Sequence, residues 1–177
     1  MQRRLSSPRM NQGPNANTEP SMNDIRLPVA APGLTVRKRV AAATALGNSG
    51  NPSAIPLLVQ SISDPHSQVR RESAQALGRL GDGEAIPALI AALSDPEPVV
   101  RTAVIAAIGR IRDGRATGAL IACLKDPDDR VRIGAATVLG KMGDHRAAKP
   151  LADLGQDPFE EVRDAAEDAL RRIRRLP

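Results

Sequence analysis

Aromatic residues are almost absent from this chain of 177 residues. It contains no Trp, no Tyr and a single Phe, Phe159, although hydrophobic residues make up 41% of the sequence. Sites that stack nucleic-acid bases on rings, cages for methylated ammonium groups, and interfaces anchored by Trp or Tyr therefore cannot be built here in their usual form. The apolar residues are instead Ala, Leu, Ile and Val, which suffice for a folded core.

Cysteine and histidine are nearly as scarce. Cys123 is the single cysteine, so a scaffold held by internal disulfides is excluded. The two histidines, His66 and His145, do not combine with Cys123 into any recognisable zinc-ligand spacing. We therefore expect no metal, no cofactor and no catalytic residue. We expect Cys123 to pack as a small apolar side chain rather than to act as a nucleophile, because unpaired cysteines often behave in that way.

Long apolar runs are also missing. The longest uncharged stretch, residues 40–63, is interrupted by Asn48, Gly50 and Pro52, which would break a membrane span. The first residues, MQRRLSSPRM, lead into polar, Pro-rich sequence rather than the apolar segment of a signal peptide. The sequence predicts a cytoplasmic protein without a membrane span.

Positive charge is concentrated at the two ends of the chain. Residues 1–39 hold seven basic and two acidic residues and account for the formal net charge of +5, whereas residues 40–177 hold 18 of each sign. Residues 1–33 are rich in Pro, Asn and Ser and are predicted to form a disordered or loosely packed basic arm. The basic residues that could contact phosphate or an acidic partner are Arg3, Arg4, Arg9, Arg171, Arg172, Arg174 and Arg175.

A repeat of 31 residues fills the remainder of the chain. The dipeptide Asp-Pro recurs at this spacing, and a Val-Arg pair follows each Asp at five and six positions, as in Val69-Arg70. One further unit, containing Arg39 and Gly47, precedes the first Asp-Pro. Self-similarity at such a period predicts structural units that stack on one another, because one small unit cannot bury its own apolar face.

Each unit is predicted to form two helices. The Asp of Asp-Pro suits an N-cap and the Pro suits the first helical position. In the third unit, apolar or small residues recur at three- and four-residue steps, which is typical of a helix: Val99, Val100, Ala103, Ala106, Ala107 and Ile111. First helices are expected near residues 35–49, 66–80, 97–111, 128–142 and 159–174. Second helices are expected near 53–63, 84–94, 115–125 and 146–155, with caps at Asn51, Asp82, Asp113 and Asp144, and the fifth unit has none.

Two rows of equivalent residues bear on stacking. Gly47, Gly78, Gly109 and Gly140 fall inside the first helices, where Gly costs about 1 kcal/mol relative to Ala, so the row indicates close helix approach. The second row is a ladder of arginines that either follows an anionic ligand or bonds to the repeated aspartates and ties the units together; regular pairing favours the second interpretation. The ladder comprises Arg39, Arg70, Arg101, Arg132 and Arg163 with Asp64, Asp95, Asp126 and Asp157.

The repeated segment, DPHSQVRRESAQALGRLGDGEAIPALIAALS, resembles the HEAT-like repeat, in the short form first named for phycobilisome lyase subunits. The resemblance covers residues 34–177, about four and a half units. It implies an all-α, right-handed α-solenoid whose second helices line the concave face. Proteins with such repeats include bilin lyase subunits, deoxyhypusine hydroxylases, DNA glycosylases and scaffolds. The hydroxylase activity is set aside because the chain lacks the His-Glu pairs that would bind its two irons. The glycosylase activity is set aside because Phe159 is the only aromatic residue available to contact an extruded base.

The concave face is the expected binding surface. Two rows of small or weakly polar residues are predicted to line it: Leu57, Ala88, Ala119 and Pro150, and Gln60, Ala91, Ala122 and Asp153. A smooth groove of this kind fits a partner helix or a flat protein surface better than a small molecule. We therefore predict a non-catalytic scaffold or adaptor that binds another protein. The alternatives are a bilin lyase subunit or phycobilisome-associated factor with a phycobiliprotein as its partner, and nucleic-acid binding through the basic ends.

Overall fold

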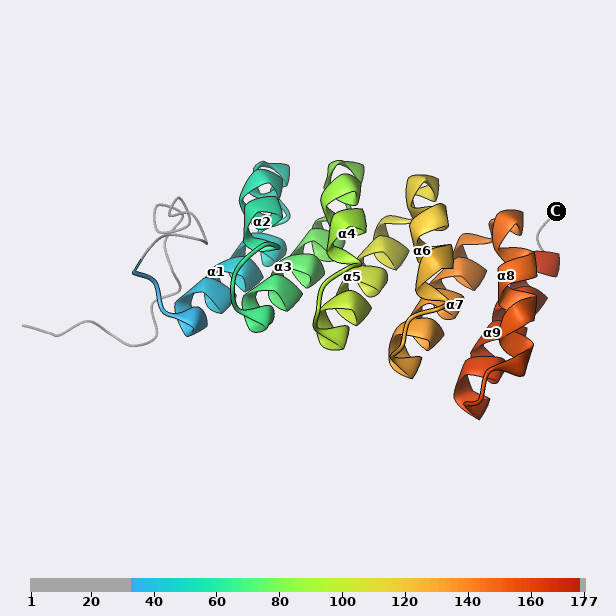
Figure 1. Ribbon diagram of the computed structural model, residues 1–177. Coiled ribbons are helices and arrows are strands. Elements are labelled where there is room, and N and C mark those ends of the chain that lie inside the picture. The colour runs from blue at the N-terminus through green and yellow to red at the C-terminus, as the bar shows by residue number, and fades with distance from the viewer. Residues whose placement is uncertain (1–32, 176–177) are drawn as a thin grey trace, which may run out of the picture.

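Five long helices alternate with four short ones in the computed structural model, which describes residues 33–175. The long first helices are α1 (Val36–Asn48), α3 (Ser67–Leu80), α5 (Pro98–Ile111), α7 (Asp129–Met142) and α9 (Glu160–Arg174). The short second helices are α2 (Ile55–Ser61), α4 (Ile86–Ala92), α6 (Thr117–Cys123) and α8 (Ala148–Asp153). The first helices lie side by side in one row and the second helices in another, with α1 and α9 at opposite ends (Figure 1). This arrangement confirms the predicted α-solenoid.

The helix lengths follow the repeat. The second helices have 6 or 7 residues, and α9, the longest helix described, has 15. Across residues 33–175, no helix combines the length and the apolar character needed to cross a bilayer. The predicted arm lies outside the described residues except for Gly33, so its boundary stays a prediction.

Side chains cap the entry to every second helix. Each second helix is preceded by a single 3-10 turn, and a cap carboxyl or amide oxygen accepts a hydrogen bond from the backbone N–H two positions later. The bond from Ser53 to Asn51 is 3.0 Å long, and those to the three aspartates are 2.9 Å. The structure thereby confirms the predicted caps Asn51, Asp82, Asp113 and Asp144.

The Asp-Pro pairs lie before the first helices, and the predicted N-cap role of their aspartates was wrong. The caps are the residues two positions later, His66, Glu97, Asp128 and Phe159. Each Asp carboxylate instead accepts a hydrogen bond from the backbone N–H of that residue, as from His66 to Asp64 at 2.8 Å, which closes a tight turn around the proline. The remaining lone pairs bind an arginine of the preceding unit, so the carboxylate does not reach the first turn of the helix.

Adjacent first helices pack closely at the predicted row of glycines. At three of these positions an added Cβ would lie 2.6–2.7 Å from the Cα of the facing alanine, in the pairs Gly47–Ala76, Gly78–Ala107 and Gly140–Ala169. Real Cβ atoms do not approach a backbone so closely, so the prediction of close helix approach is confirmed. Between α5 and α7 the nearest atom to the Gly109 position is a methyl carbon of Val138, at 2.7 Å. At that junction the atoms facing the glycine thus belong to a branched side chain, whereas at the other three they include the backbone of an alanine.

Candidate functional site

The second-helix face consists of the solvent-facing residues of α2, α4, α6 and α8. The structure places both predicted rows on it. The half-buried row is Leu57, Ala88, Ala119 and Pro150, and the exposed row is Gln60, Ala91, Ala122 and Asp153. No charged residue occurs in α2, α4 or α6. The charged residues of this face are Lys149 and Asp153 on α8, and Lys125 follows the end of α6.

A third row, absent from the predicted binding residues, completes this face. Val59, Ile90 and Ile121 pack against the core while keeping part of each side chain in solvent. Spacing along the sequence does not identify this row, because it does not show how much of a side chain the neighbouring unit covers. A shallow groove of about 510 Å³ lies between α2 and α4, and both apolar residues such as Val59, Ala88 and Ala91 and the ladder residues Asp64, Arg70 and Asp95 line it. The helices of this face are therefore apolar, and the groove between them also contacts paired charges of the ladder.

The ladder of arginines and aspartates is a chain of bidentate ion pairs. Arg101 lies 2.8 Å from Asp126 through Nε and 2.7 Å through Nη2, and its Nη1 donates to the carbonyl oxygens of Asp95 and Pro96. Each such arginine therefore joins the turn before its own helix to the turn after its unit. The same arrangement occurs in the pairs Arg70–Asp95 and Arg132–Asp157, and Arg39 pairs with Asp64 in the same way but donates to the carbonyl oxygen of Leu34. Arg163 retains the two carbonyl bonds, but no carboxylate partner for it lies within residues 33–175.

The side chains of these ion pairs are largely buried, and the pairing shifts the pKa values of several of them. Burial opposes ionisation of Asp95, but hydrogen bonds from Arg70 and from the Glu97 N–H outweigh it, so the pKa of Asp95 lies below its ordinary value. For Asp64, burial is likewise outweighed by hydrogen bonds from Arg39 and from the His66 N–H, so its pKa is also lowered. The hydrogen bonds from Arg132 lower the pKa of Asp157. The hydrogen bonds from Arg101 to Asp126 raise the pKa of Arg101. The guanidinium donors of the paired arginines are thus engaged within the protein.

Acid is expected to weaken the stack through these carboxylates. A group whose folded pKa is depressed contributes stability that is complete above its unfolded pKa and is lost as the pH falls through the folded value. The pKa of an aspartate in the unfolded chain is about 4. The melting temperature should therefore stay constant between about pH 7 and pH 5 and fall steadily from about pH 4 to about pH 2. Thermal melts followed by circular dichroism measure this. A melting temperature independent of pH down to pH 2 would contradict the linkage.

Cys123 lies at the end of α6 and is 7% exposed. Burial raises the pKa of its thiol to about 11, and the nearby Asp126 carboxylate adds to the effect. Only a thiolate attacks alkylating reagents readily, so this environment suppresses reactivity.

Alkylation of Cys123 is therefore expected to be slow in the folded protein. A rise in thiol pKa from 9.0 to about 11 reduces the thiolate fraction at pH 8 by about 100-fold, and burial slows the reaction further. The rate with iodoacetamide, followed by mass spectrometry, should be at least about 100-fold lower in buffer than in denaturing urea. Glutathione in both solutions serves as the control for the reagent. Equal rates would show that the thiol is accessible.

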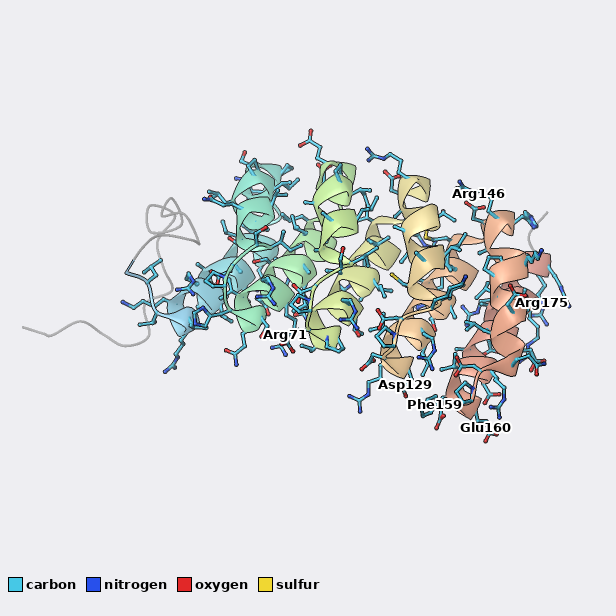
Figure 2. The ribbon with its side chains drawn as sticks, in the orientation of Figure 1. Arg71, Asp129, Arg146, Phe159, Glu160 and Arg175 are labelled. Carbon is cyan, nitrogen blue, oxygen red and sulfur yellow. The ribbon has the colours of Figure 1, made fainter. Side chains whose placement is uncertain are left out.

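Acidic and basic groups occupy opposite ends of α9. Glu160 lies at the first turn and Arg175 beyond the last, as the labelled side chains in Figure 2 show. Arg171 is bonded to Asp168 at 2.5 Å. The four predicted basic contacts of this end, Arg171, Arg172, Arg174 and Arg175, are all exposed. Arg3, Arg4 and Arg9 lie outside the described residues, so nucleic-acid contact through the two ends stays a prediction.

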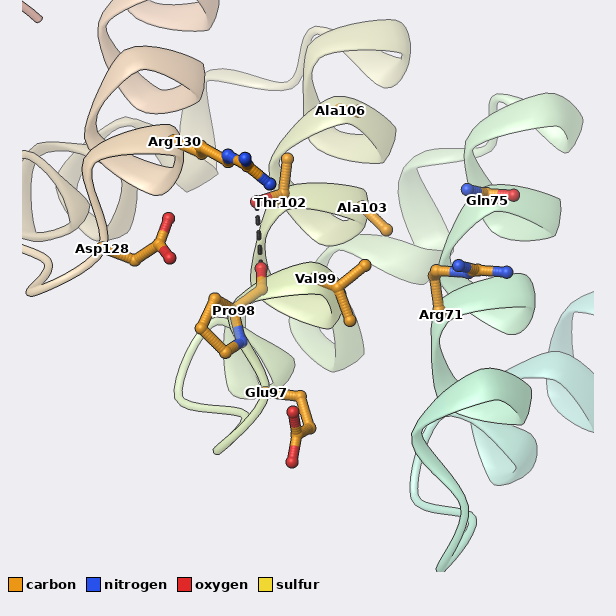
Figure 3. Close-up of a pocket in the computed structure, with 10 residues that line it drawn as sticks. All are labelled: Arg71, Gln75, Glu97, Pro98, Val99, Thr102, Ala103, Ala106, Asp128 and Arg130. Carbon is orange, nitrogen blue, oxygen red and sulfur yellow. Dashed lines mark hydrogen bonds between the residues drawn. The ribbon is translucent and has the colours of Figure 1, made fainter.

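A second hollow, which we call the outer groove, lies on the row of first helices (Figure 3). Its volume is about 570 Å³, and it was not among the predicted sites. Its lining residues come from α3, α5, α7 and the segments just before α5 and α7: Arg71, Gln75, Glu97, Pro98, Val99, Thr102, Ala103, Ala106, Asp128 and Arg130. Of the residues whose spacing predicted the helix here, Val99 and Ala106 are exposed, whereas Val100, Ala103 and Ala107 are buried.

No candidate metal centre is found within residues 33–175, where no three His, Cys, Asp or Glu side chains converge as ligands would. His66 lies beside the ladder, with Nδ1 3.1 Å from Arg39 Nη2. His145 is exposed on the 3-10 turn His145–Ala147 before α8.

Comparison with known proteins adds a family and a set of similar folds. The family described as HEAT repeats matches residues 35–107 and 86–171. No curated protein sequence matches the chain. The structure of the complex of CpcE and CpcF of phycocyanin lyase from Nostoc sp. PCC7120 is similar, with a TM-score of 0.74 and 24% identity over 96% of this chain and 71% of that chain. A designed armadillo repeat protein in complex with the peptide (KR)4 gives a TM-score of 0.64 and 19% identity over 84% of this chain and 80% of that chain.

Proposed function

Since this chain belongs to the HEAT-repeat family, we propose that it is a non-catalytic scaffold or adaptor whose second-helix face binds another protein. One observation carries the proposal: three successive helices, α2, α4 and α6, expose residues to solvent without a single charge among them. Charged residues are depleted at the centres of protein interfaces, where each would lose its hydration.

The kind of partner follows from the side chains of this face. Its exposed row over the first three second helices is formed by Gln60, Ala91 and Ala122, none of which is a large apolar anchor for a pocket of another protein. The third row, Val59, Ile90 and Ile121, offers apolar area at regular intervals along the array. A partner helix or a flat surface can cover such a strip, and the binding energy would come from the apolar area removed from water.

The charge of this face separates the proposed partner from the peptide of a structural neighbour. The designed armadillo repeat protein was solved with the basic peptide (KR)4. The second-helix face has no carboxylate on α2, α4 or α6, and Lys125 and Lys149 lie toward its far end. We therefore propose a partner whose contact surface is apolar and neutral over the first three units.

Site-specific photo-crosslinking tests the proposal. A photoreactive residue placed at Ala91 or Ala122 in the native cell should join the chain to one partner, whereas the same residue at Ala41, exposed on α1, should not. With that partner purified, Ala91→Glu combined with Ala122→Glu should weaken binding at least about tenfold. Ala41→Glu is the matched control and should leave the affinity unchanged. Equal crosslinking from all three positions would refute the assignment of the face.

A bilin lyase subunit is the second candidate function, because the similarity to the CpcE and CpcF complex extends over 96% of this chain. Co-expression with a phycobiliprotein and a bilin source, followed by absorbance of the purified phycobiliprotein, tests this candidate. Covalent chromophore that appears only in the presence of this chain would establish it. Chromophore transfer that does not depend on the chain would count against it.

A further inference from the structure

The outer surface of α5 departs from the repeat at two positions. Val99 and Ala106 are both exposed, and Val99 retains 49% of its accessible surface. Each of the other four first helices carries polar side chains at both equivalent positions. These pairs are Arg37 and Thr44, Gln68 and Gln75, Arg130 and Thr137, and Glu161 and Asp168. The fold therefore does not require apolar residues there, and α5 alone presents an apolar outer strip.

This strip forms the floor of the outer groove. Val99 and Ala103 point from α5 toward α3, and Arg130 extends from α7 toward Thr102 (Figure 3). The Thr102 hydroxyl donates to the carbonyl oxygen of Pro98 at 2.9 Å, so the polar atom in the floor is already satisfied. A smaller hollow of about 250 Å³ adjoins the outer groove, with Gln75, Ala103 and Ala106 lining both. It extends the outer groove toward the C-terminal ends of α3 and α5.

Cations flank the floor along its length. Arg71 on α3 and Arg130 on α7 line the groove, and Arg110 lines its extension. Within residues 33–175 none of the three makes an ion pair or a side-chain hydrogen bond. Arg79, also in the extension, is bonded to Glu72 at 2.7 Å. The carboxylates in the groove itself are those of Glu97 and Asp128.

We propose that the outer groove binds an acidic amphipathic helix of another protein. Aliphatic side chains of that helix would cover Val99, Ala103 and Ala106, and carboxylates on its two flanks would pair with Arg71 and Arg130. This surface is distinct from the second-helix face and would allow the chain to hold two partners at once.

A nucleic acid fits the groove less well than a helix. Phosphates would meet Glu97 and Asp128 at its edge, and the bases would find an aliphatic floor without any ring on which to stack. A peptide can place neutral or basic side chains opposite those two carboxylates, so it satisfies both kinds of charge in the groove.

Peptide selection tests the inference on the full chain. A display library of random peptides about 16 residues long, enough for four helical turns, is panned on the protein and counter-sorted against Val99→Gln combined with Ala106→Gln. That variant gives α5 the glutamines that α3 carries at the same positions, so it should melt like the parent. Peptides lost in the counter-sort should be rich in Asp and Glu, with aliphatic residues three and four positions apart.

The affinities decide the outcome. Selected peptides should bind the double variant at least about tenfold more weakly than the parent, and Arg71→Gln combined with Arg130→Gln should reduce the salt dependence of binding. Arg37→Gln combined with Thr44→Gln makes the equivalent change on α1 and should have no effect. Selected peptides without an excess of acidic residues, or peptides that bind all variants equally, would overturn the inference. Single-stranded DNA that displaces them as well as unlabelled peptide does would also overturn it.

Discussion

Replacement of Gly78 by alanine is expected to lower the free energy of unfolding by about 1–3 kcal/mol. The added Cβ would lie 2.7 Å from the Cα and 2.9 Å from the Cβ of Ala107, so α3 and α5 would have to move apart. Helix propensity acts in the opposite direction, since Ala is favoured over Gly by about 1 kcal/mol inside a helix. The steric term is expected to dominate because the obstacle is backbone rather than a flexible side chain. Urea unfolding followed by circular dichroism measures the difference.

Gly118 provides a matched control for this substitution. It also lies within a helix, α6, but apart from its chain neighbours and the backbone of its own helix no atom lies within 4 Å of the position that its Cβ would occupy. Gly118→Ala is therefore expected to raise the free energy of unfolding by about 0.5–1 kcal/mol. The same chemical change should thus have opposite signs at the two sites. A gain in stability at both sites would mean that the stack tolerates wider helix spacing than the structure shows.

Replacement of Arg101 by alanine is expected to cost about 3–5 kcal/mol. Its side chain is 9% exposed and that of Asp126 is 10% exposed, so the substitution leaves a carboxylate with little access to water and without its partner. The carbonyl oxygens of Asp95 and Pro96 lose their donor at the same time. Chemical denaturation provides the measurement, and a broader unfolding transition would show that the units have begun to unfold separately.

Arg163 is the control for the ladder. It occupies the same position in the last unit and makes the same two carbonyl bonds, to Asp157 at 2.8 Å and to Pro158 at 3.2 Å, but no carboxylate faces it within the described residues. Arg163→Ala is expected to cost about 1 kcal/mol, as for ordinary hydrogen bonds. The difference between the two variants then measures the ion pair between units. Equal losses would show that the carbonyl bonds, not the carboxylates, dominate.

The sequence repeat was sufficient to predict the helices. The role of the Asp-Pro aspartates was not predictable from it, because that role depends on contacts between neighbouring units. The spacing of 31 residues placed the helices correctly because every unit repeats the same caps, such as Asp82. The aspartates of Asp-Pro were assigned as N-caps from their neighbours in sequence, whereas their carboxylates bind an arginine 25 residues earlier. Val99 and Ala106 fit the helical spacing of the third unit, but this spacing does not show that both side chains are exposed.

The ladder also has a consequence for the gene. The ladder and the glycine row join residues of neighbouring units at fixed offsets, such as the 25 residues from Arg70 to Asp95 and the 29 from Gly78 to Ala107. Loss of residues 71–101 would place Asp126 25 residues after Arg70 and restore the same pairing. Misaligned copying of the coding sequence can therefore add or remove a whole unit without breaking any of these pairings. The length of the array, and with it the area offered to a partner, is a heritable quantity that can change in steps of one unit.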